Sequence, residues 1–177
     1  SIYEVPLKMH QQHLDEIVLT KTGLPINGEP HLEPWLNFLH RMKNATKTVR
    51  IGLVGKYVEL PDAYKSINES LFQAATYNDR KLDLQYIHSE KLNSGNVDAM
   101  LSSLDGVLIA PGFGQRGIEG KFIALKYARE HDIPTFGVCL GMQCMVIEYA
   151  RDVLGYTDAN STEMDVTTKH NVIDLME

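Results

Sequence analysis

The sequence predicts a doubly wound α/β fold, in which helices cover both faces of a mostly parallel sheet. Short apolar, β-rich runs alternate with segments of helical periodicity from residue 49 to about residue 154. Such alternation is typical of parallel sheets built from strand–helix–strand units. Glycine-rich turns at residues 52–57, 111–114 and 137–141 fall where the predicted strands end, as expected for interior parallel strands.

Composition supports a globular protein. The chain has 177 residues, 44% hydrophobic and 23% charged, which allows one ordinary domain, or a smaller domain with an attached segment. Its longest apolar runs, residues 107–111 and 136–140, are far shorter than the roughly 20 residues that cross a bilayer. Residues 1–7 do not resemble a secretory signal. We therefore expect no membrane partner and a cytoplasmic location.

Charge and cysteine content narrow the class of partner. The formal charge is −6, and no dense block of lysine or arginine is present, so nothing indicates a nucleic-acid partner. The two cysteines, Cys139 and Cys144, are poorly placed for a disulfide within one expected helix. The sequence therefore predicts reduced thiols and a small-molecule or protein partner.

Residues 1–45 are predicted to be an interdomain linker with short helices. Leu14, Ile17 and Val18 suit one short helix, and the spacing within residues 35–42 suggests a second, ending before Asn44. Between them, regularity is broken by glycines and prolines, namely Gly23, Pro25, Gly28, Pro30 and Pro34. We expect the second helix to pack on the following domain, residues 46–177, or on a missing one.

That domain begins with a predicted strand at residues 49–55. The next helix is expected to have Asp62 as its N-cap and to run through Ile67, Leu71 and Ala74. The alternation then continues with a strand at 82–87, a helix at 97–104, a strand at 106–110, a helix at 117–131, a strand at 135–138 and a helix at 140–154. In such sheets the reactive groups lie at the carboxyl ends of the strands.

The G-x-C-x-G motif at residues 137–141 predicts a nucleophile elbow, a sharp strand-to-helix turn that exposes the central residue. The flanking glycines make room for that turn. The positive end of the helix dipole favours the thiolate of Cys139. The alternative is a cysteine that only packs, because free cysteine is often buried. We interpret Cys144, farther along the helix, as a core residue.

A thiolate that attacks an amide creates a negatively charged oxygen, which needs N–H donors. The N–H of Leu140 follows the nucleophile directly, and the glycine turn at residues 111–114 allows close approach of a second backbone segment. The simpler alternative for this second segment is an ordinary glycine turn.

Residues 139–143, Cys-Leu-Gly-Met-Gln, resemble the nucleophile motif of class I glutamine amidotransferases. The remaining stretches resemble, in order and spacing, the CTP synthase family within that class. They are residues 55–57, 60–66, 116–121 (Arg-Gly-Ile-Glu-Gly-Lys) and 160–163 (Asn-Ser-Thr-Glu). Residues 2–7 resemble the start of the segment that joins the two halves of such enzymes. The resemblance covers essentially the whole chain and implies a flavodoxin-like fold.

The resemblance implies the ammonia-producing half of an enzyme that aminates UTP to CTP. ATP and Mg²⁺ would act in an N-terminal synthetase domain of the same polypeptide, GTP would be an allosteric activator, and the parent would be a homotetramer. No cofactor or metal is expected in this domain.

The resemblance also implies site residues. L-glutamine would be held by Gly112, Leu140, Gly141, Met142, Gln143 and Glu163. A carboxylate at Glu163 suits the substrate's α-ammonium group, and Gln143 suits its polar groups. Phe113 and Arg116 would face GTP. The family usually has two glycines before this phenylalanine, whereas Pro111 leaves only Gly112 here.

The family takes the histidine and glutamate of its triad from a His-x-Glu motif downstream of Asn-Ser-Thr-Glu. By this comparison they fall beyond Glu177, as does an arginine that binds the substrate carboxylate. We therefore expect a C-terminally incomplete domain with little or no turnover by itself. His170 follows Cys139 in triad order but does not occupy the family position of the catalytic histidine. His88 and His131 suit packed or solvated roles.

Two alternatives remain open from the sequence. One is a glutaminase subunit that serves a different synthetase, which dependence of the parent on UTP and ATP would distinguish. The other is a non-catalytic α/β assembly module in which Cys139 is structural. In that case the parent would keep glutamine-dependent synthesis after Cys139→Ala.

Overall fold

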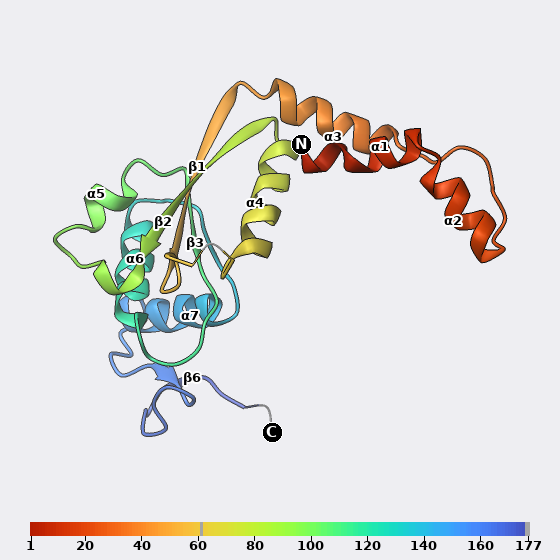
Figure 1. The fold of residues 1–177 in the computed structure, drawn as a ribbon. Helices are drawn as coiled ribbons and strands as arrows, with labels where there is room; N and C mark the ends of the chain where they lie inside the picture. Colours follow the sequence, from red (N-terminus) through yellow and green to blue (C-terminus); the bar gives the residue numbers. More distant parts are fainter. Residues whose placement is uncertain (61, 176–177) are drawn as a thin grey trace.

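The centre of the protein is a four-stranded parallel sheet (Figure 1). The computed structural model describes residues 1–60 and 62–175, so Pro61, Met176 and Glu177 lie outside it. The strands are β1 (Lys47–Gly55), β2 (Arg80–His88), β3 (Gly106–Ile109) and β4 (Thr135–Gly137), and their order in space is β2-β1-β3-β4. Every pairing in this sheet is parallel, which confirms the predicted fold class.

Helices cover both faces of the sheet. Side chains along a strand alternate between these faces, so neighbouring residues of one strand pack against different helices. Val54 and Ile109 pack in the cluster formed with α5 (Val97–Leu101), α6 (Ile118–Glu130) and α7 (Leu140–Asp152). Their chain neighbours, Leu53 and Leu108, pack on the opposite side with α4 (Lys65–Tyr77). Consecutive apolar residues in β1 and β3 thus serve two cores, as a sheet buried on both faces requires.

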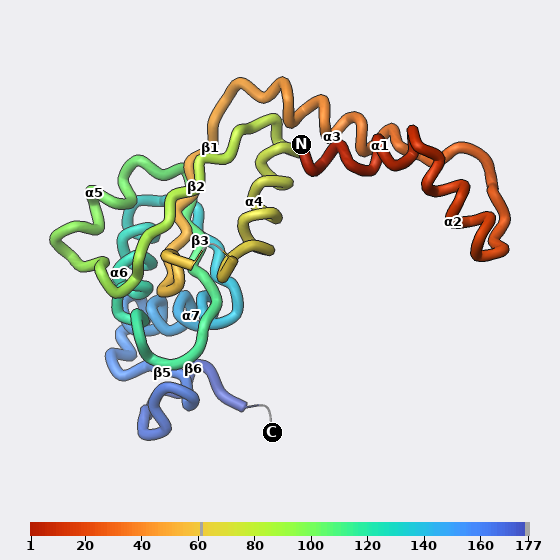
Figure 2. The backbone as a smooth tube through the Cα atoms, in the orientation of Figure 1, coloured from red at the N-terminus to blue at the C-terminus, as the bar shows by residue number. Residues whose placement is uncertain are grey.

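The N-terminal segment forms an arm of helices (Figure 2). Its elements are η1 (Ile2–Glu4), α1 (Val5–Gln11), α2 (Leu14–Thr22) and α3 (Glu33–Asn44). Tyr3 stacks on Phe72 of α4 with 5.2 Å between ring centroids, and Phe38 contacts Tyr77 at 5.8 Å. The arm is therefore anchored to the domain by aromatic packing. Its role as a linker stays a prediction.

The boundaries of the helices in this arm differ slightly from the sequence prediction. Helix α1, which was not predicted, has Pro6 in its first turn, where proline costs no intrahelical hydrogen bond. Helix α3 includes Asn44 instead of ending before it, and the Asn44 side chain donates to the carbonyl of His40.

The predicted N-cap of α4 is wrong. The helix begins at Lys65, its N-cap is Tyr64, and no side chain caps it. The ring of Tyr64 is buried against Leu53 and Ala110, and its hydroxyl accepts a hydrogen bond from the N–H of Tyr57 at 3.2 Å. This packing holds the chain in turns until Tyr64, whereas the carboxylate of Asp62 is exposed.

Two other predicted helices are too long. Helix α5 ends at Leu101 because the N–H of Asp105 donates to the carbonyl of Arg50 at 2.8 Å and draws the chain back to the sheet. Helix α7 ends at Asp152, three residues before Gly155, which has a φ of 78°. The short parallel pair of β5 (Asn160–Ser161) and β6 (Asn171–Ile173) was not predicted, since strands of two or three residues have no recognisable period.

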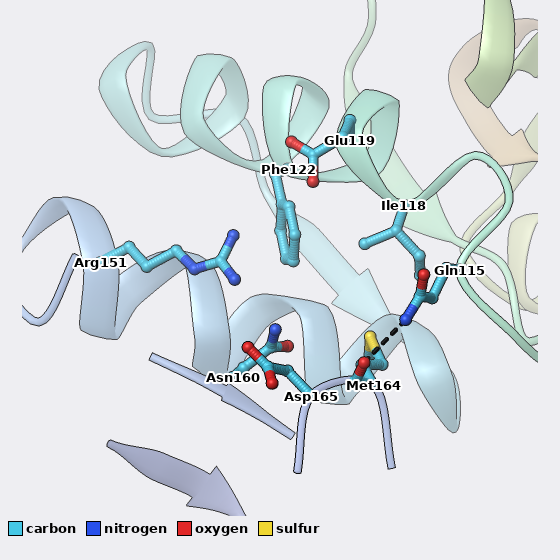
Figure 3. Close-up of a pocket in the computed structure, with 8 residues that line it drawn as sticks. All are labelled: Gln115, Ile118, Glu119, Phe122, Arg151, Asn160, Met164 and Asp165. Carbon is cyan, nitrogen blue, oxygen red and sulfur yellow. Dashed lines mark hydrogen bonds between the residues drawn. The ribbon is translucent and has the colours of Figure 1, made fainter. Parts of the chain in front are cut away.

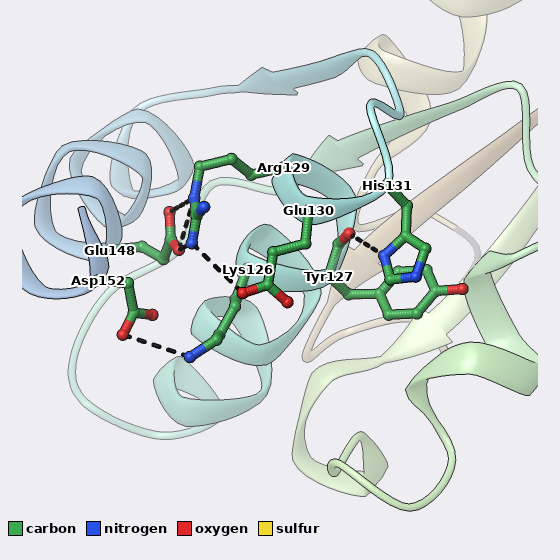
Figure 4. A network of polar contacts seen from close by, with 7 residues as sticks. All are labelled: Lys126, Tyr127, Arg129, Glu130, His131, Glu148 and Asp152. Atoms are coloured by element: carbon green, nitrogen blue, oxygen red, sulfur yellow. Dashed lines mark hydrogen bonds and ion pairs between the residues drawn. The ribbon is translucent and has the colours of Figure 1, made fainter.

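A polar network ties α6 to α7 (Figure 4). Arg129 donates from Nη2 to Glu148 Oε1 at 2.7 Å and from Nε to the same oxygen at 3.1 Å. The side chain of Glu148 is only 4% exposed, so this pair replaces its hydration. A second, longer ion pair joins Lys126 to Asp152 at 3.5 Å. The buried Arg129–Glu148 pair fixes α7, whose N-cap is the predicted nucleophile, whereas the exposed Lys126–Asp152 pair contributes little.

Across the described residues, no helix combines the length and the apolar character that a membrane span requires.

Candidate active site

Cys139 occupies a sharp turn between β4 and α7. Its backbone has φ 53° and ψ −113°, a region that side chains rarely adopt and that costs roughly 1–3 kcal/mol. The flanking glycines are sterically required. A Cβ at Gly137 would lie 2.5 Å from the backbone of Gly141, and one at Gly141 would overlap the carbonyl oxygen of Ile109. The predicted turn is therefore present, and the catalytic role of Cys139 stays a prediction.

The two cysteines have opposite surroundings. Cys139 is exposed, whereas Cys144 is fully buried in the core beneath α7. Burial is the main reason that the pKa of Cys144 rises to about 11, although Lys121 and Arg151 oppose that rise. Cys144 is thus a packed, protonated thiol, as expected. The alternative that Cys139 only packs in a core does not fit its exposure.

The glycine turn after β3 meets the first turn of α7. A Cβ at Gly112 would lie 3.7 Å from the Cδ2 atom of Leu140, so the single glycine before Phe113 still lies beside the elbow. The N–H groups of Gly141 and Gln143 are satisfied by the carbonyls of Val138 and Cys139, at 2.9 and 3.1 Å. Within the described residues the N–H of Leu140 has no acceptor, which leaves it free for a ligand.

Two buried lysines hold the turn that contains Gly112. Lys121 on α6 donates from Nζ to the carbonyl of Ala110 at 2.7 Å. Lys56, just after β1, donates to the carbonyl of Phe113. The lysines are 1% and 7% exposed, respectively. No role at the site was predicted for either lysine from the sequence. One signal was available, because Lys121 lies three residues after Ile118 and therefore on the apolar face of the helix.

A pocket of about 520 Å³ includes Gln143, about one helical turn after Cys139, although none of residues 137–141 lines it. It is lined by Gln143 of α7 and by residues of the C-terminal segment, namely Ser161, Thr162, Glu163, Val166, Ile173, Asp174 and Leu175. The Oε1 atom of Gln143 is buried and lacks a partner among the described residues. The N–H of Glu163 donates to Ser161 Oγ at 3.1 Å, which helps to fix its segment. The structure thus brings together two of the predicted glutamine contacts, and Ser161 is a supporting residue that the sequence did not indicate.

The remaining predicted residues lie nearby but are more exposed. Met142 is half exposed on the first turn of α7, and the ring of Phe113 is 81% exposed. Arg116 forms an ion pair with Glu90 at 3.0 Å, and its guanidinium lies 5.6 Å from the centroid of the Tyr57 ring.

A different pocket, of about 540 Å³, lies between α6 and residues 160–165 (Figure 3). It contains none of the predicted site residues. Gln115 donates from Nε2 to the carbonyl of Met164 at 2.7 Å. Arg151 lies against the Phe122 ring and donates from Nε to the carbonyl of Ala159 at 2.7 Å. These contacts hold the segment that carries Glu163 against Gln115, just before α6, and against Arg151 of α7.

The histidines have structural surroundings. His170 Nδ1 lies 2.6 Å from Asp158 Oδ1, and its ring stacks on Tyr156. His131 stacks on Tyr127, the carbonyl of which lies 2.8 Å from His131 Nδ1. In the part of the chain that the structure describes, no histidine is hydrogen-bonded to Cys139.

Comparisons with known proteins agree with this geometry. The sequence model of a family described as "Glutamine amidotransferase class-I" matches residues 59–174. The chain is 67% identical over 177 residues to a CTP synthase of Bacteroides fragilis, 61% identical to one of Porphyromonas gingivalis and 55% identical to one of Flavobacterium johnsoniae. It is covered completely in each case but spans about 33% of those proteins.

Among solved structures, the chain is similar to one described as "Trypanosoma brucei CTPS - glutaminase domain with bound acivicin". The TM-score is 0.68 at 41% sequence identity, over 73% of this chain and 51% of that one.

Proposed function

Because this chain belongs to the glutamine amidotransferase class-I family, we propose that it is the ammonia-producing part of a CTP synthase. It hydrolyses glutamine through a thioester on Cys139, and the ammonia aminates UTP to CTP in a synthetase part that uses ATP and Mg²⁺. The similarity to CTP synthases along the whole chain supports this parent over a different synthetase.

The observation that carries the proposal is the elbow itself. An exposed cysteine is held at φ 53° between two glycines that have no space for a side chain. A strained backbone of this kind persists only where the surrounding structure enforces it, and it is often found at functional sites. A merely structural cysteine needs neither the exposure nor the strain.

The surrounding groups suit the steps of amide hydrolysis. The Cys139 thiolate attacks the side-chain amide carbon, and the carbonyl oxygen becomes negatively charged. The N–H of Leu140, which has no acceptor among the described residues, and the adjacent backbone at Gly112 would receive that oxygen. The C–N bond then breaks and the protonated nitrogen leaves as ammonia. Water hydrolyses the resulting thioester to glutamate and restores the thiol.

Proton transfer in these steps requires a base. No histidine is hydrogen-bonded to Cys139 among the described residues, and we propose that the parent enzyme supplies this base. We expect the complete parent to carry out turnover.

Substrate selection would depend on the pocket that includes Gln143 and Glu163. The first residue lines it from α7 and the second from the C-terminal segment. The α-ammonium of glutamine would pair with the Glu163 carboxylate, and the unpartnered Gln143 Oε1 would accept a hydrogen bond from the substrate. We also propose that GTP contacts Phe113 and Arg116, because an exposed aromatic ring and a guanidinium on one loop suit a base and a phosphate.

The direct test uses the purified parent protein. With UTP, ATP, Mg²⁺ and glutamine it is expected to form CTP, and omission of either UTP or ATP should abolish that product. Glutamate release that couples to another acceptor would instead support a glutaminase for a different synthetase. The absence of any glutamine hydrolysis would support a non-catalytic module.

The Glu163→Gln substitution is expected to raise the KM for glutamine roughly tenfold to a hundredfold with a smaller change in kcat. The reason is that a charge-assisted hydrogen bond to the bound substrate is lost. Steady-state glutamine hydrolysis by the parent measures the effect. Asp165→Asn is the matched control, because Asp165 lies on the same segment but lines the other pocket. Equal KM values for Glu163→Gln and the wild type would remove Glu163 from the site.

A further inference from the structure

The most unusual buried group in the domain is the ammonium of Lys121. It is the largest side chain that is fully buried, at 1% exposure, and no carboxylate forms an ion pair with it among the described residues. An isolated charge in a protein interior is costly, so it usually has a compensating partner or shifts its pKa. Its one hydrogen bond, to the carbonyl of Ala110, is a partner for the N–H but not for the charge.

The geometry places this ammonium under the predicted oxyanion site. Ala110 follows β3 directly, and Gly112 comes two residues later. A Cβ at Gly112 would lie 4.0 Å from Lys121 Nζ and 3.7 Å from Leu140 Cδ2. One small region therefore contains the ammonium, the glycine turn and the residue that follows the nucleophile. A negative charge formed there would be close to a positive charge that water does not screen.

Electrostatics link the same lysine to the thiols. Burial is the largest influence on Lys121 and lowers its pKa. The thiolate forms of Cys144 and, more weakly, Cys139 raise the pKa, whereas Lys56 lowers it. Cys139 is thus among the groups whose charge acts on Lys121, so the two side chains lie close enough for their charges to interact.

We propose that Lys121 is a positioning residue for glutamine hydrolysis, in which its buried ammonium stabilises the Cys139 thiolate and the oxyanion formed beside Gly112. The proposal rests on the proposed glutaminase function and adds a fixed positive charge to the backbone donors. Cys144 is not the thiolate that this charge serves, because its own pKa is raised to about 11.

The other charged side chains near the site make different contacts from those of Lys121. Lys56 approaches from the end of β1 and is held by the carbonyl of Phe113. From α6 and α7, Glu119 and Arg151 influence Cys144. None of these side chains donates to the carbonyl of Ala110, so substitution of Lys121 changes one charge and leaves theirs in place.

The experiment measures how fast iodoacetamide alkylates Cys139 in the complete parent enzyme, with the peptide that contains Cys139 quantified by mass spectrometry across pH. Lys121→Met removes the charge at nearly constant volume. Near neutral pH we expect its alkylation to be roughly tenfold slower than in the wild type, because the reacting thiolate loses a nearby positive charge that water does not screen. At strongly alkaline pH the rates should converge, because the thiol is ionised in both proteins.

Two further variants separate charge from structure. Lys121→Gln is neutral but keeps an N–H donor for Ala110, and it should alkylate as slowly as Lys121→Met. Lys126→Met removes an exposed lysine from the same helix, and it should match the wild type. The kcat for glutamine hydrolysis should fall with the alkylation rate in both Lys121 variants, with little change in KM.

Several outcomes would overturn the proposal. Wild-type alkylation rates in Lys121→Gln but not in Lys121→Met would mean that only the hydrogen bond matters. Wild-type pH profiles in both variants would mean that the charge has no effect on Cys139. In either case the wild-type parent would still hydrolyse glutamine. A parent whose Cys139 is unreactive and whose glutamine hydrolysis is absent would instead contradict the glutaminase function itself.

Discussion

The Cys139→Ala parent is expected to lose glutamine-dependent CTP formation by about ten-thousandfold or more, because no other group can form the thioester. It should keep CTP formation from free ammonia, since the synthetase chemistry needs ammonia and not its source. The measurement is CTP production with each nitrogen donor at saturating UTP and ATP.

Cys144→Ala is the matched control for that experiment. Cys144 is buried and its pKa is raised to about 11, so the substitution should preserve glutamine-dependent synthesis with some loss of stability. If Cys139→Ala retained synthesis from glutamine, the chain would be a non-catalytic module. If it lost synthesis from both nitrogen donors, the substitution would have damaged the synthetase part as well.

The parallel sheet could be predicted because its signals are local. Consecutive apolar residues in β1, such as Leu53 and Val54, indicate a strand buried on both faces, and the structure places them in separate cores. The start of α4 could not be predicted in the same way. It depends on a contact between the Tyr64 hydroxyl and the N–H of Tyr57, and on packing against β3, which is distant in the sequence.

In the candidate site, too, the features with local sequence signals could be predicted and those that depend on distant contacts could not. The elbow was predictable because Gly137, Cys139 and Gly141 lie within five consecutive residues. One pocket brings Gln143 to Glu163, and only the family resemblance indicated that pairing. The lysines that hold the glycine turn act through backbone carbonyls, for which the sequence has no motif. A lysine at an apolar helix position, such as Lys121, is the one sequence signal that could have indicated them.

Gly141→Ala is expected to reduce the free energy of unfolding by about 3 kcal/mol and to slow the alkylation of Cys139 by iodoacetamide in the parent, because overpacking displaces backbone. The added Cβ would overlap the carbonyl oxygen of Ile109 and lie 2.9 Å from its carbon. That carbonyl cannot move freely, because it accepts a hydrogen bond from the N–H of Val138 at 3.1 Å and Ile109 pairs with both neighbouring strands. Helix α7 would therefore have to shift and change the elbow.

The contrast with Gly95→Ala makes this prediction specific to the elbow. A Cβ at Gly95 would meet only the side-chain oxygen of Asn93 at 3.2 Å, and a flexible side chain can move away, so a change within about 0.5–1 kcal/mol is expected. Urea denaturation and the rate of Cys139 alkylation by iodoacetamide in both variants measure the difference. Equal stability and labelling would show that α7 does not lie this close to β3. The strained turn, and with it the structural argument for an activated cysteine, would then be lost.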